Sequence, residues 1–209
     1  MACLFHAYPC LSCSWDIIAR YGPTNHDLPH AFFSDWARIA LDESKHFTLL
    51  TKRLIEISPS TPYGSLSVNA GLWESAQDTF HSLRSRLAII HLVHEARGLD
   101  FGPATIEKFR RSGDEETVAV LEIVHADEVT HVTAGHRWFS WICKNEGVDP
   151  IQTFREEVRR GWRGAIKGPF NDEDRAKAGM TKEFYTDLRG ERGDASKIAI
   201  GYEQAVSRH

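Results

Sequence analysis

The apolar positions of this chain recur mostly at spacings of three and four residues, the pattern of amphipathic helices. One such stretch covers residues 27–57, with Pro29 near its start, where helices accept proline. Residues 58–71 are rich in Pro, Ser and Gly and predict a linker. A second helix is expected from about residue 72 to residue 97, with Gly98 as its C-cap.

The same pattern continues through the middle of the chain. Pro103 is expected to open a short helix that closes near Gly113, and Asp114 to cap a long helix that runs to about residue 145. The tail is polar and interrupted by glycines, so we expect part of it to wrap the core and its end, from about Gly190, to fray. The chain therefore predicts an all-α fold.

Composition narrows the class of protein. The chain has 209 residues, of which 42% are hydrophobic and 26% charged, as in a globular protein of one domain with appendages. Its formal charge of −4 gives no basic excess that would favour a nucleic acid or a membrane surface. No apolar run approaches the roughly 18 residues of a membrane helix, and the N-terminus lacks the features of a signal peptide. Four cysteines do not form a disulfide framework, so we expect a cytoplasmic protein.

Two segments share the pattern D-E-x-x-H, namely residues 42–46 (DESKH) and residues 127–131 (DEVTH). In a helix, the glutamate and the histidine of each segment lie roughly 60° apart on one face. Glu43 falls on the same face as Trp36 and Ile39, so it belongs to an apolar stripe. Glu128 likewise shares its side with apolar residues: Leu121, Val124, Val132, Phe139 and Ile142.

Carboxylates on an apolar face need a compensating charge, because an unpaired buried carboxylate costs several kcal/mol. One such motif would fit a solvated face, but two copies on apolar faces favour a metal shared between facing helices. The predicted ligands are Glu43, His46, Glu128 and His131. The predicted outer residues are Asp42 and Asp127, which could accept hydrogen bonds from the outer histidine nitrogens.

A helical bundle site of this kind also takes single glutamates from other helices. Glu95 is the candidate, because a turn near Gly113 would bring it level with Glu128 in an antiparallel pair. The neighbouring His91 and His94 are expected to be outer or core residues rather than ligands. A third E-x-x-H, Glu122 with His125, is rotated away from Glu128, and we interpret it as surface or helix packing.

At these residues the chain resembles a family, the ferritin-like proteins catalogued as domain of unknown function 455, relatives of the carboxylate-bridged di-iron bundles. The resemblance covers roughly residues 14–180. The matching stretches are SWDIIARYG, FFSDWARIALDESKHFTLL, YGSL with GLWESA, LVHEARGLDFGPATIEKFR, GDEETVAVLEIVHADEVTHVTAGHRWFSWIC and GPFNDEDRAKAG. The resemblance implies a four-helix bundle with two metal ions. It places the family's ligands on Glu43, His46, Glu95, Glu128 and His131.

The N-terminus departs from the family. Family members carry H-x-E-x-Q before the SWDIIAR segment, whereas ungapped matching puts Ala7 in place of that glutamate, and Pro9 would disturb a helix. We therefore expect residues 1–13 to be an aberrant or truncated segment with a short or damaged first helix, followed by the bundle over 14–165 and an extension over 166–209. A rival interpretation of this segment is a zinc site with the spacing C-x2-H-x3-C-x2-C, formed by Cys3, His6, Cys10 and Cys13. We prefer the alternative that the segment is unstructured and carries free thiols.

The expected function is oxygen-dependent oxidoreduction by two iron ions, with manganese as the alternative metal. The expected partners are dioxygen and an organic substrate, without a membrane or nucleic acid, and a homodimer is one assembly that this interpretation allows. Two other hypotheses stay open: an iron-handling ferroxidase, and a non-catalytic bundle that has lost its first glutamate. No P-loop, zincin, nucleophile-elbow or dinucleotide motif is present. The basic helix over residues 150–164 is expected to be a solvated face.

Overall fold

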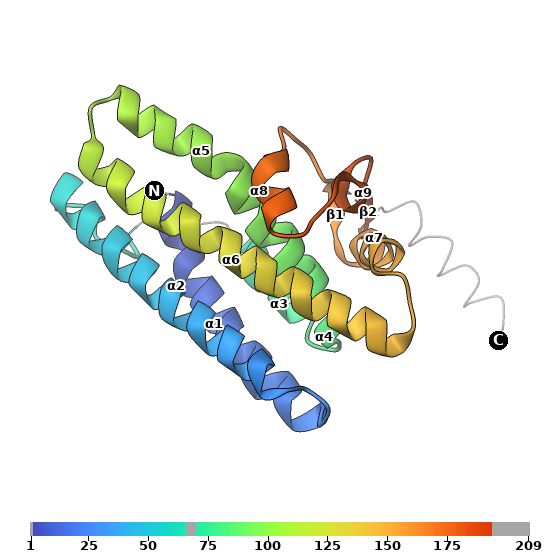
Figure 1. Ribbon diagram of the computed structural model, residues 1–209. Coiled ribbons are helices and arrows are strands. Elements are labelled where there is room, and N and C mark those ends of the chain that lie inside the picture. The colour runs from blue at the N-terminus through green and yellow to red at the C-terminus, as the bar shows by residue number, and fades with distance from the viewer. Residues whose placement is uncertain (1, 66–69, 194–209) are drawn as a thin grey trace, which may run out of the picture.

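The computed structural model describes residues 2–65 and 70–193, with side chains from residue 12 onward, and these ranges are predominantly helical (Figure 1). Helix α1 (Ala2–Tyr21) and helix α2 (His30–Ile57) are joined through a 3-10 turn, Gly22–Thr24. The remaining helices are α3 (Gly71–Asp78), α4 (Leu83–Arg86), a π-helix (Leu87–His94), α5 (Glu95–Arg111), α6 (Glu115–Glu146), α7 (Pro150–Gly161), α8 (Asp172–Lys177) and α9 (Lys182–Tyr185). The strands are β1 (Arg163–Ala165) and β2 (Arg189–Glu191). The predicted all-α class is confirmed.

The long helices pack side by side (Figure 1). Helix α1 lies along α2, α2 lies along α6, and α6 packs against the π-helix and α5. Helix α4, the π-helix and α5 follow one another without a break and form one helical rod over residues 83–111. Among the described residues, no helix is long and apolar enough to cross a membrane.

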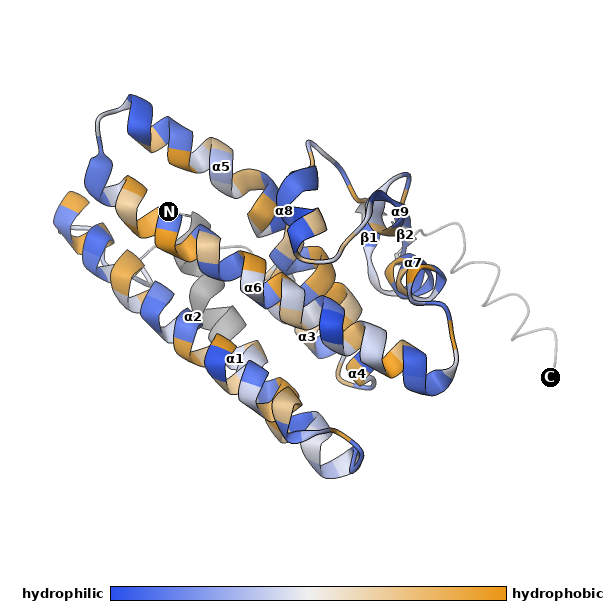
Figure 2. Ribbon diagram, in the orientation of Figure 1, coloured by the Kyte–Doolittle hydropathy of each residue, from blue (hydrophilic) through white to orange (hydrophobic). Residues whose placement is uncertain are grey.

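The hydrophobic stripe of α2 shows how the sequence positions the interior. Phe32, Trp36 and Ile39 are buried, as their spacing predicts. Glu43 and His46 continue the same stripe and are buried with them. Figure 2 shows hydrophobic positions recurring along the long helices. The helix ends at Ile57, as the sequence predicted. Because Glu43 and His46 lie on the buried stripe of this helix, both polar side chains point into the interior.

The first helix is not short, which corrects the prediction for residues 1–13. Helix α1 has 20 residues and continues through Pro9. A proline removes one backbone hydrogen bond, but packing of a whole helix can outweigh that loss. Here the helix packs along α2 and buries Cys13, Ile17 and Tyr21. The segment is therefore helical rather than unstructured, and the side chains of the predicted zinc residues Cys3, His6 and Cys10, like that of Ala7, lie outside the described residues.

The predicted helix over residues 72–97 begins where expected, since α3 starts at Gly71, but it is interrupted in its middle and ends later than predicted. It is interrupted between Asp78 and Leu83, because hydroxyl side chains there compete for the helical hydrogen bonds. The Ser82 hydroxyl caps α4 by accepting from the Ser85 amide, and the Thr79 hydroxyl accepts from Arg86 Nε at 2.9 Å. A short helix, α3, followed by the rod over residues 83–111 therefore replaces the single predicted helix.

At the other end, the rod runs past Gly98 to Arg111, and Pro103 lies inside α5 rather than opening a new helix. Burial against α6 supports this segment despite its two glycines and its proline. At Gly102, a Cβ atom would lie 2.4 Å from His125 Nδ1, so the glycine allows the two helices to approach. Local signals predicted a helix end that tertiary packing overrides.

Helix α6 begins and ends as predicted. The Asp114 side chain accepts from the Thr117 amide, and Gly147 closes the helix with a φ of +69°, a conformation that favours glycine. Helix α7 starts at Pro150 and stops at Gly161, a little earlier than expected, because the chain then turns into β1.

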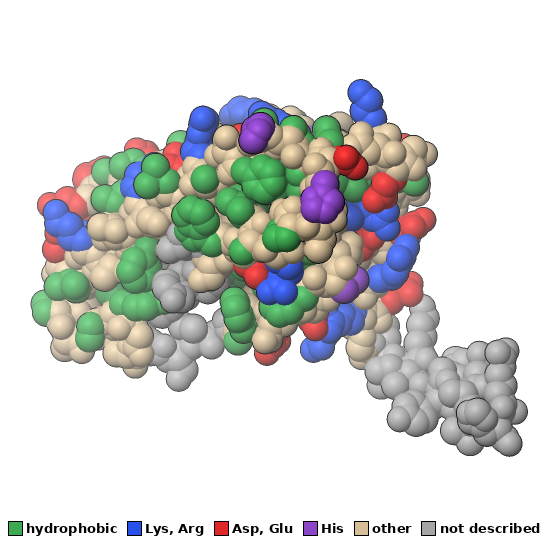
Figure 3. All heavy atoms as spheres, turned by 90° about the horizontal axis from the view of Figure 1, so that it is seen from below, with side chains coloured by type: hydrophobic (Ala, Val, Ile, Leu, Met, Phe, Trp, Pro, Cys, Tyr) green, Lys and Arg blue, Asp and Glu red, His purple; other side chains and the backbone are tan. Residues whose placement is uncertain are grey.

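The C-terminal segment packs on the helices. Strands β1 and β2 pair antiparallel, with Gly164 opposite Gly190. The prediction that the chain frays from about Gly190 therefore places the start of fraying too early. From α7, Arg155 donates to the backbone carbonyls of Glu183 and Thr186, each at 2.9 Å. Figure 3 shows acidic and basic side chains interspersed on one face of the molecule. The predicted fraying beyond residue 193 concerns residues outside the described range.

Candidate metal centre

The two D-E-x-x-H segments face each other in the interior. Glu43 and His46 come from the middle of α2, and Glu128 and His131 from the middle of α6. Glu43, His46 and His131 are each only 1% exposed, and the Glu128 side chain is 16% exposed. The apolar spacing of each helix therefore places these four side chains between the helices, as the sequence predicted.

Glu95 joins them from the start of α5. Its backbone amide bonds to the Ile90 carbonyl, five residues back, at the end of the π-helix. Glu43, Glu95, Glu128 and His131 each offer one ligand atom, and these four atoms lie within 4.8 Å of one another. We call this set the inner cluster; it is a grouping that could hold a metal ion.

His46 lies beside the inner cluster. Its Nδ1 atom is 3.6 Å from Glu43 Oε2, while His131 Nδ1 is 3.3 Å from Glu43 Oε1. The Glu43 carboxylate thus lies between the two imidazoles, with one oxygen toward each. All five residues that the sequence nominated as ligands lie together.

Several inner atoms have no hydrogen-bond partner. They are Glu43 Oε1, His46 Nδ1, Glu128 Oε2 and His131 Nδ1. An unsatisfied buried polar atom costs roughly 1 to 3 kcal/mol. The four atoms belong to neighbouring side chains, and deprotonated imidazole nitrogens and carboxylate oxygens are kinds of atom that bind divalent metals.

Glu95, Glu128 and His131 of the inner cluster have perturbed pKa values. Burial raises the pKa of Glu95 well above its ordinary value, and the negative charges of Glu128 and Glu43 add to this effect. Burial would also raise the pKa of Glu128, but contacts with His131 and Glu95 lower it. Burial would lower the pKa of His131, yet the facing glutamates raise it well above its ordinary value. Both upward shifts favour the protonated forms of Glu95 and His131, which lessens the negative charge of the cluster.

The outer aspartates reach across to the opposite helix. Asp127 of α6 lies 2.9 Å from Nε2 of His46 on α2, and Asp42 of α2 lies 3.6 Å from Nε2 of His131 on α6. Both contacts involve the outer ring nitrogens, which leaves both Nδ1 atoms toward the interior. The pairing across helices was not foreseen, although the sequence nominated both aspartates.

Sequence reasoning missed Lys45. Its Nζ atom lies 3.0 Å from Asp42 Oδ1 and 2.6 Å from Asp127 Oδ2. The signal was present in DESKH, because Lys45 follows Asp42 by three residues and such pairs meet on a helix. Only the contact with Asp127 could not be predicted from the sequence, because it depends on how α2 packs against α6.

The other histidines near the predicted ligands in the sequence lie outside the inner cluster, as expected. His94 Nε2 is 3.0 Å from the Ser75 hydroxyl. His125 Nε2 is 2.9 Å from Asp174 of α8, and Glu122 pairs with Arg110 on the surface. The interpretation of the third E-x-x-H as surface and helix packing agrees with these contacts.

His91 is a buried core histidine. Its ring centroid lies 4.2 Å from that of Trp36, and its Nε2 atom has no hydrogen-bond partner. Burial and the nearby Arg86 hold the pKa of His91 well below its ordinary value. It therefore stays neutral in the folded protein.

This pKa predicts a pH dependence of stability. Below about pH 6.5 the unfolded chain gains a proton at His91 that the folded chain does not, so stability falls as the pH falls. Relative to His91→Gln, we expect the wild type to lose up to about 1.4 kcal/mol of unfolding free energy per pH unit below that value. Urea unfolding of both proteins between about pH 5 and pH 7.5 measures this difference, and identical pH profiles would contradict it.

Cys13 lies in α1 and is 1% exposed. Burial raises the pKa of its thiol to about 12. The thiolate is the form that binds zinc, so this environment does not favour Cys13 as a zinc ligand.

Comparison with known proteins places the chain in a family. A family described as "Protein of unknown function (DUF455)" matches residues 6–186. An uncharacterized protein of Haemophilus influenzae is 38% identical over 152 residues, which is 73% of this chain and 52% of that relative. The chain therefore spans about half the length of the curated relative that it matches. No solved structure matches it. On the extent of the family match and the identity to this relative, the chain belongs to the DUF455 family.

Proposed function

We propose that this chain is a di-metal protein, with iron as its metal, that uses dioxygen to oxidise an organic substrate. The observation that carries the proposal is the inner cluster, in which four ligand atoms lie within 4.8 Å of one another. The resemblance to ferritin-like di-iron bundles supports the same interpretation, because it nominates the same five side chains.

The donor set fits two divalent cations. Imidazole and carboxylate together suit iron, and they also accept manganese. Glu43 would bridge the two positions, since it offers one oxygen toward His131 and one toward His46. The three inner and two outer carboxylates, together with Lys45, carry a net charge of −4 when the imidazoles are neutral, and two divalent cations balance it.

The surrounding residues define what the site would do. A bound pair of ferrous ions supplies the electrons that dioxygen requires. The protein holds the His46 imidazole through Asp127, which fixes the orientation of that ring. Trp36 and Ile39 precede Glu43 on α2, and Val132 follows His131 on α6. All three are buried in the hydrophobic core, and apolar surroundings of this kind limit the access of bulk water.

Oxygen consumption tests this proposal. Protein loaded anaerobically with Fe²⁺ and then mixed with oxygenated buffer and a reductant should consume oxygen continuously. Glu128→Gln removes one inner carboxylate, and we expect its rate to fall by at least about 100-fold, since changes outside the ligand sphere alone cost 10- to 100-fold.

The matched control is Glu122→Gln, which removes a carboxylate from the same helix at a 54% exposed position. This variant should consume oxygen like the wild type. A single uptake that stops once the iron is oxidised would favour the ferroxidase alternative. Equal rates in the wild type and Glu128→Gln would refute the proposed site.

A further inference from the structure

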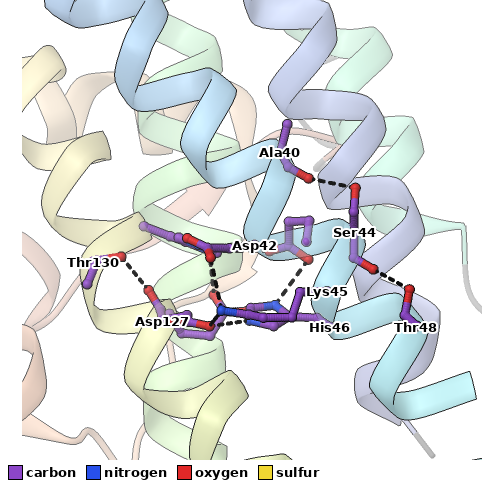
Figure 4. A network of polar contacts seen from close by, with 11 residues as sticks. Ala40, Asp42, Ser44, Lys45, His46, Thr48, Asp127 and Thr130 are labelled. Atoms are coloured by element: carbon purple, nitrogen blue, oxygen red, sulfur yellow. Dashed lines mark hydrogen bonds and ion pairs between the residues drawn. The ribbon is translucent and has the colours of Figure 1, made fainter. Parts of the chain in front are cut away.

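The outer side of the candidate metal centre is a cross-brace between α2 and α6 (Figure 4). Each helix contributes an aspartate that contacts the histidine of the other helix. The His46 imidazole is hydrogen-bonded to Asp127, so its position depends on the distance between the helices as well as on its own backbone.

Lys45 lies between the two aspartates. Its single ammonium group contacts Asp42 at 3.0 Å and Asp127 at 2.6 Å. The two carboxylates therefore lie within about 6 Å of each other, where like charges repel. The Lys45 side chain is 42% exposed and the aspartates are 20% and 24% exposed, so this contact forms at the edge of the interior.

The brace is not symmetric. The position in DEVTH that corresponds to Lys45 is Thr130, whose hydroxyl donates to the Asp127 backbone carbonyl instead (Figure 4). One lysine from α2 therefore serves both aspartates. Its contact with Asp127 is the shorter one, and Asp127 in turn makes the shorter contact with a histidine.

We propose that Lys45 is a positioning residue for the di-metal site, an inference that rests on the proposed function. The ammonium group holds both aspartates in place across the two helices. Asp127 in turn holds the His46 imidazole through its Nε2 atom at 2.9 Å, with Nδ1 toward the metal positions, whereas Asp42 lies 3.6 Å from His131 Nε2, too far for a hydrogen bond. Without the lysine, the aspartates repel each other, Asp127 moves, and the His46 imidazole loses its fixed orientation.

This role predicts an unusual sign for the effect on metal affinity. Lys45 is a positive charge near a cation site, so by Coulomb's law alone its removal should tighten the binding of a divalent cation. A positioning role predicts the opposite, because the affinity that the ordered outer residues provide is lost. We expect Lys45→Met to weaken Co²⁺ binding by about 10- to 100-fold, as outer-residue changes do.

The experiment is a calorimetric Co²⁺ titration of the full chain. Lys45→Arg keeps the charge and should retain most of the affinity. The matched control is Lys52→Met, an exposed lysine seven residues further along the same helix, which should bind like the wild type. Urea unfolding of each metal-free variant separates lost affinity from lost folding.

A double-mutant cycle identifies the route of the effect. If Lys45 acts through Asp127, Asp127→Asn combined with Lys45→Met should bind hardly more weakly than Asp127→Asn alone. Additive losses would show that Lys45 does not act through this aspartate and would overturn the inference. Binding by Lys45→Met that equals or exceeds the wild type would also overturn it while leaving the metal site intact. A wild type that binds no Co²⁺ would refute the proposed function and this inference together.

Discussion

Replacing Asp100 by alanine is expected to lower the free energy of unfolding by about 3 to 5 kcal/mol, because it leaves a buried arginine without its counterion. Asp100 and Arg175 have side chains that are 1% and 2% exposed. The arginine donates to the carboxylate from Nε at 2.8 Å and from Nη2 at 2.7 Å. Its guanidinium also lies near the rings of Phe170 and Tyr185. This pair joins α5 to α8, so its loss should loosen the C-terminal segment.

Chemical denaturation of the wild type and Asp100→Ala measures the loss. Glu173→Ala is the control, since it removes an ion pair on α8 at an 80% exposed position and should cost at most about 1 kcal/mol. The double variant Asp100→Leu with Arg175→Met should recover much of the stability, because apolar side chains can replace a buried ion pair. A small loss in Asp100→Ala would mean that water reaches Arg175.

Glu95→Gln is expected to separate folding from metal binding. Burial and neighbouring charges raise the pKa of Glu95, which favours a neutral group at this position in the metal-free protein. An amide of the same shape should change the unfolding free energy by no more than about 1 kcal/mol at neutral pH. Metal binding requires the deprotonated carboxylate, so the affinity for Co²⁺ should fall by more than about 100-fold.

Urea unfolding and a Co²⁺ titration of this variant check the two halves of the expectation. Unchanged affinity would remove Glu95 from the ligand set. Severe destabilisation of the metal-free variant would show instead that the ionised carboxylate supports the fold.

Much of the candidate site could be predicted because its residues follow helical periodicity. Glu43 lies seven residues after Trp36 and four after Ile39, so a helix that buries these two must bury Glu43. Glu95 was predicted because an antiparallel pair of helices would place it level with Glu128. Local sequence could not reveal that each aspartate serves the opposite helix, since this depends on how α2 and α6 are set against each other.

The fold was predictable where capping chemistry marks a boundary and less so where burial decides. Asp114 and Gly147 delimit α6 as their side-chain chemistry and conformation require. Gly98 and Pro103 are equally strong local signals, yet the rod continues through both because it is packed on α6. The π-helix before Glu95 has no recognisable sequence signature.

Metal content is the most direct test of the central claim. The full chain and a Glu43→Ala/Glu128→Ala variant should be purified in parallel after aerobic expression in iron-supplemented medium and analysed for iron. We expect about two iron ions per wild-type chain, as in a di-iron bundle site, and loss of this iron in the variant. Equal iron in both proteins, or no metal in a folded wild type, would contradict it.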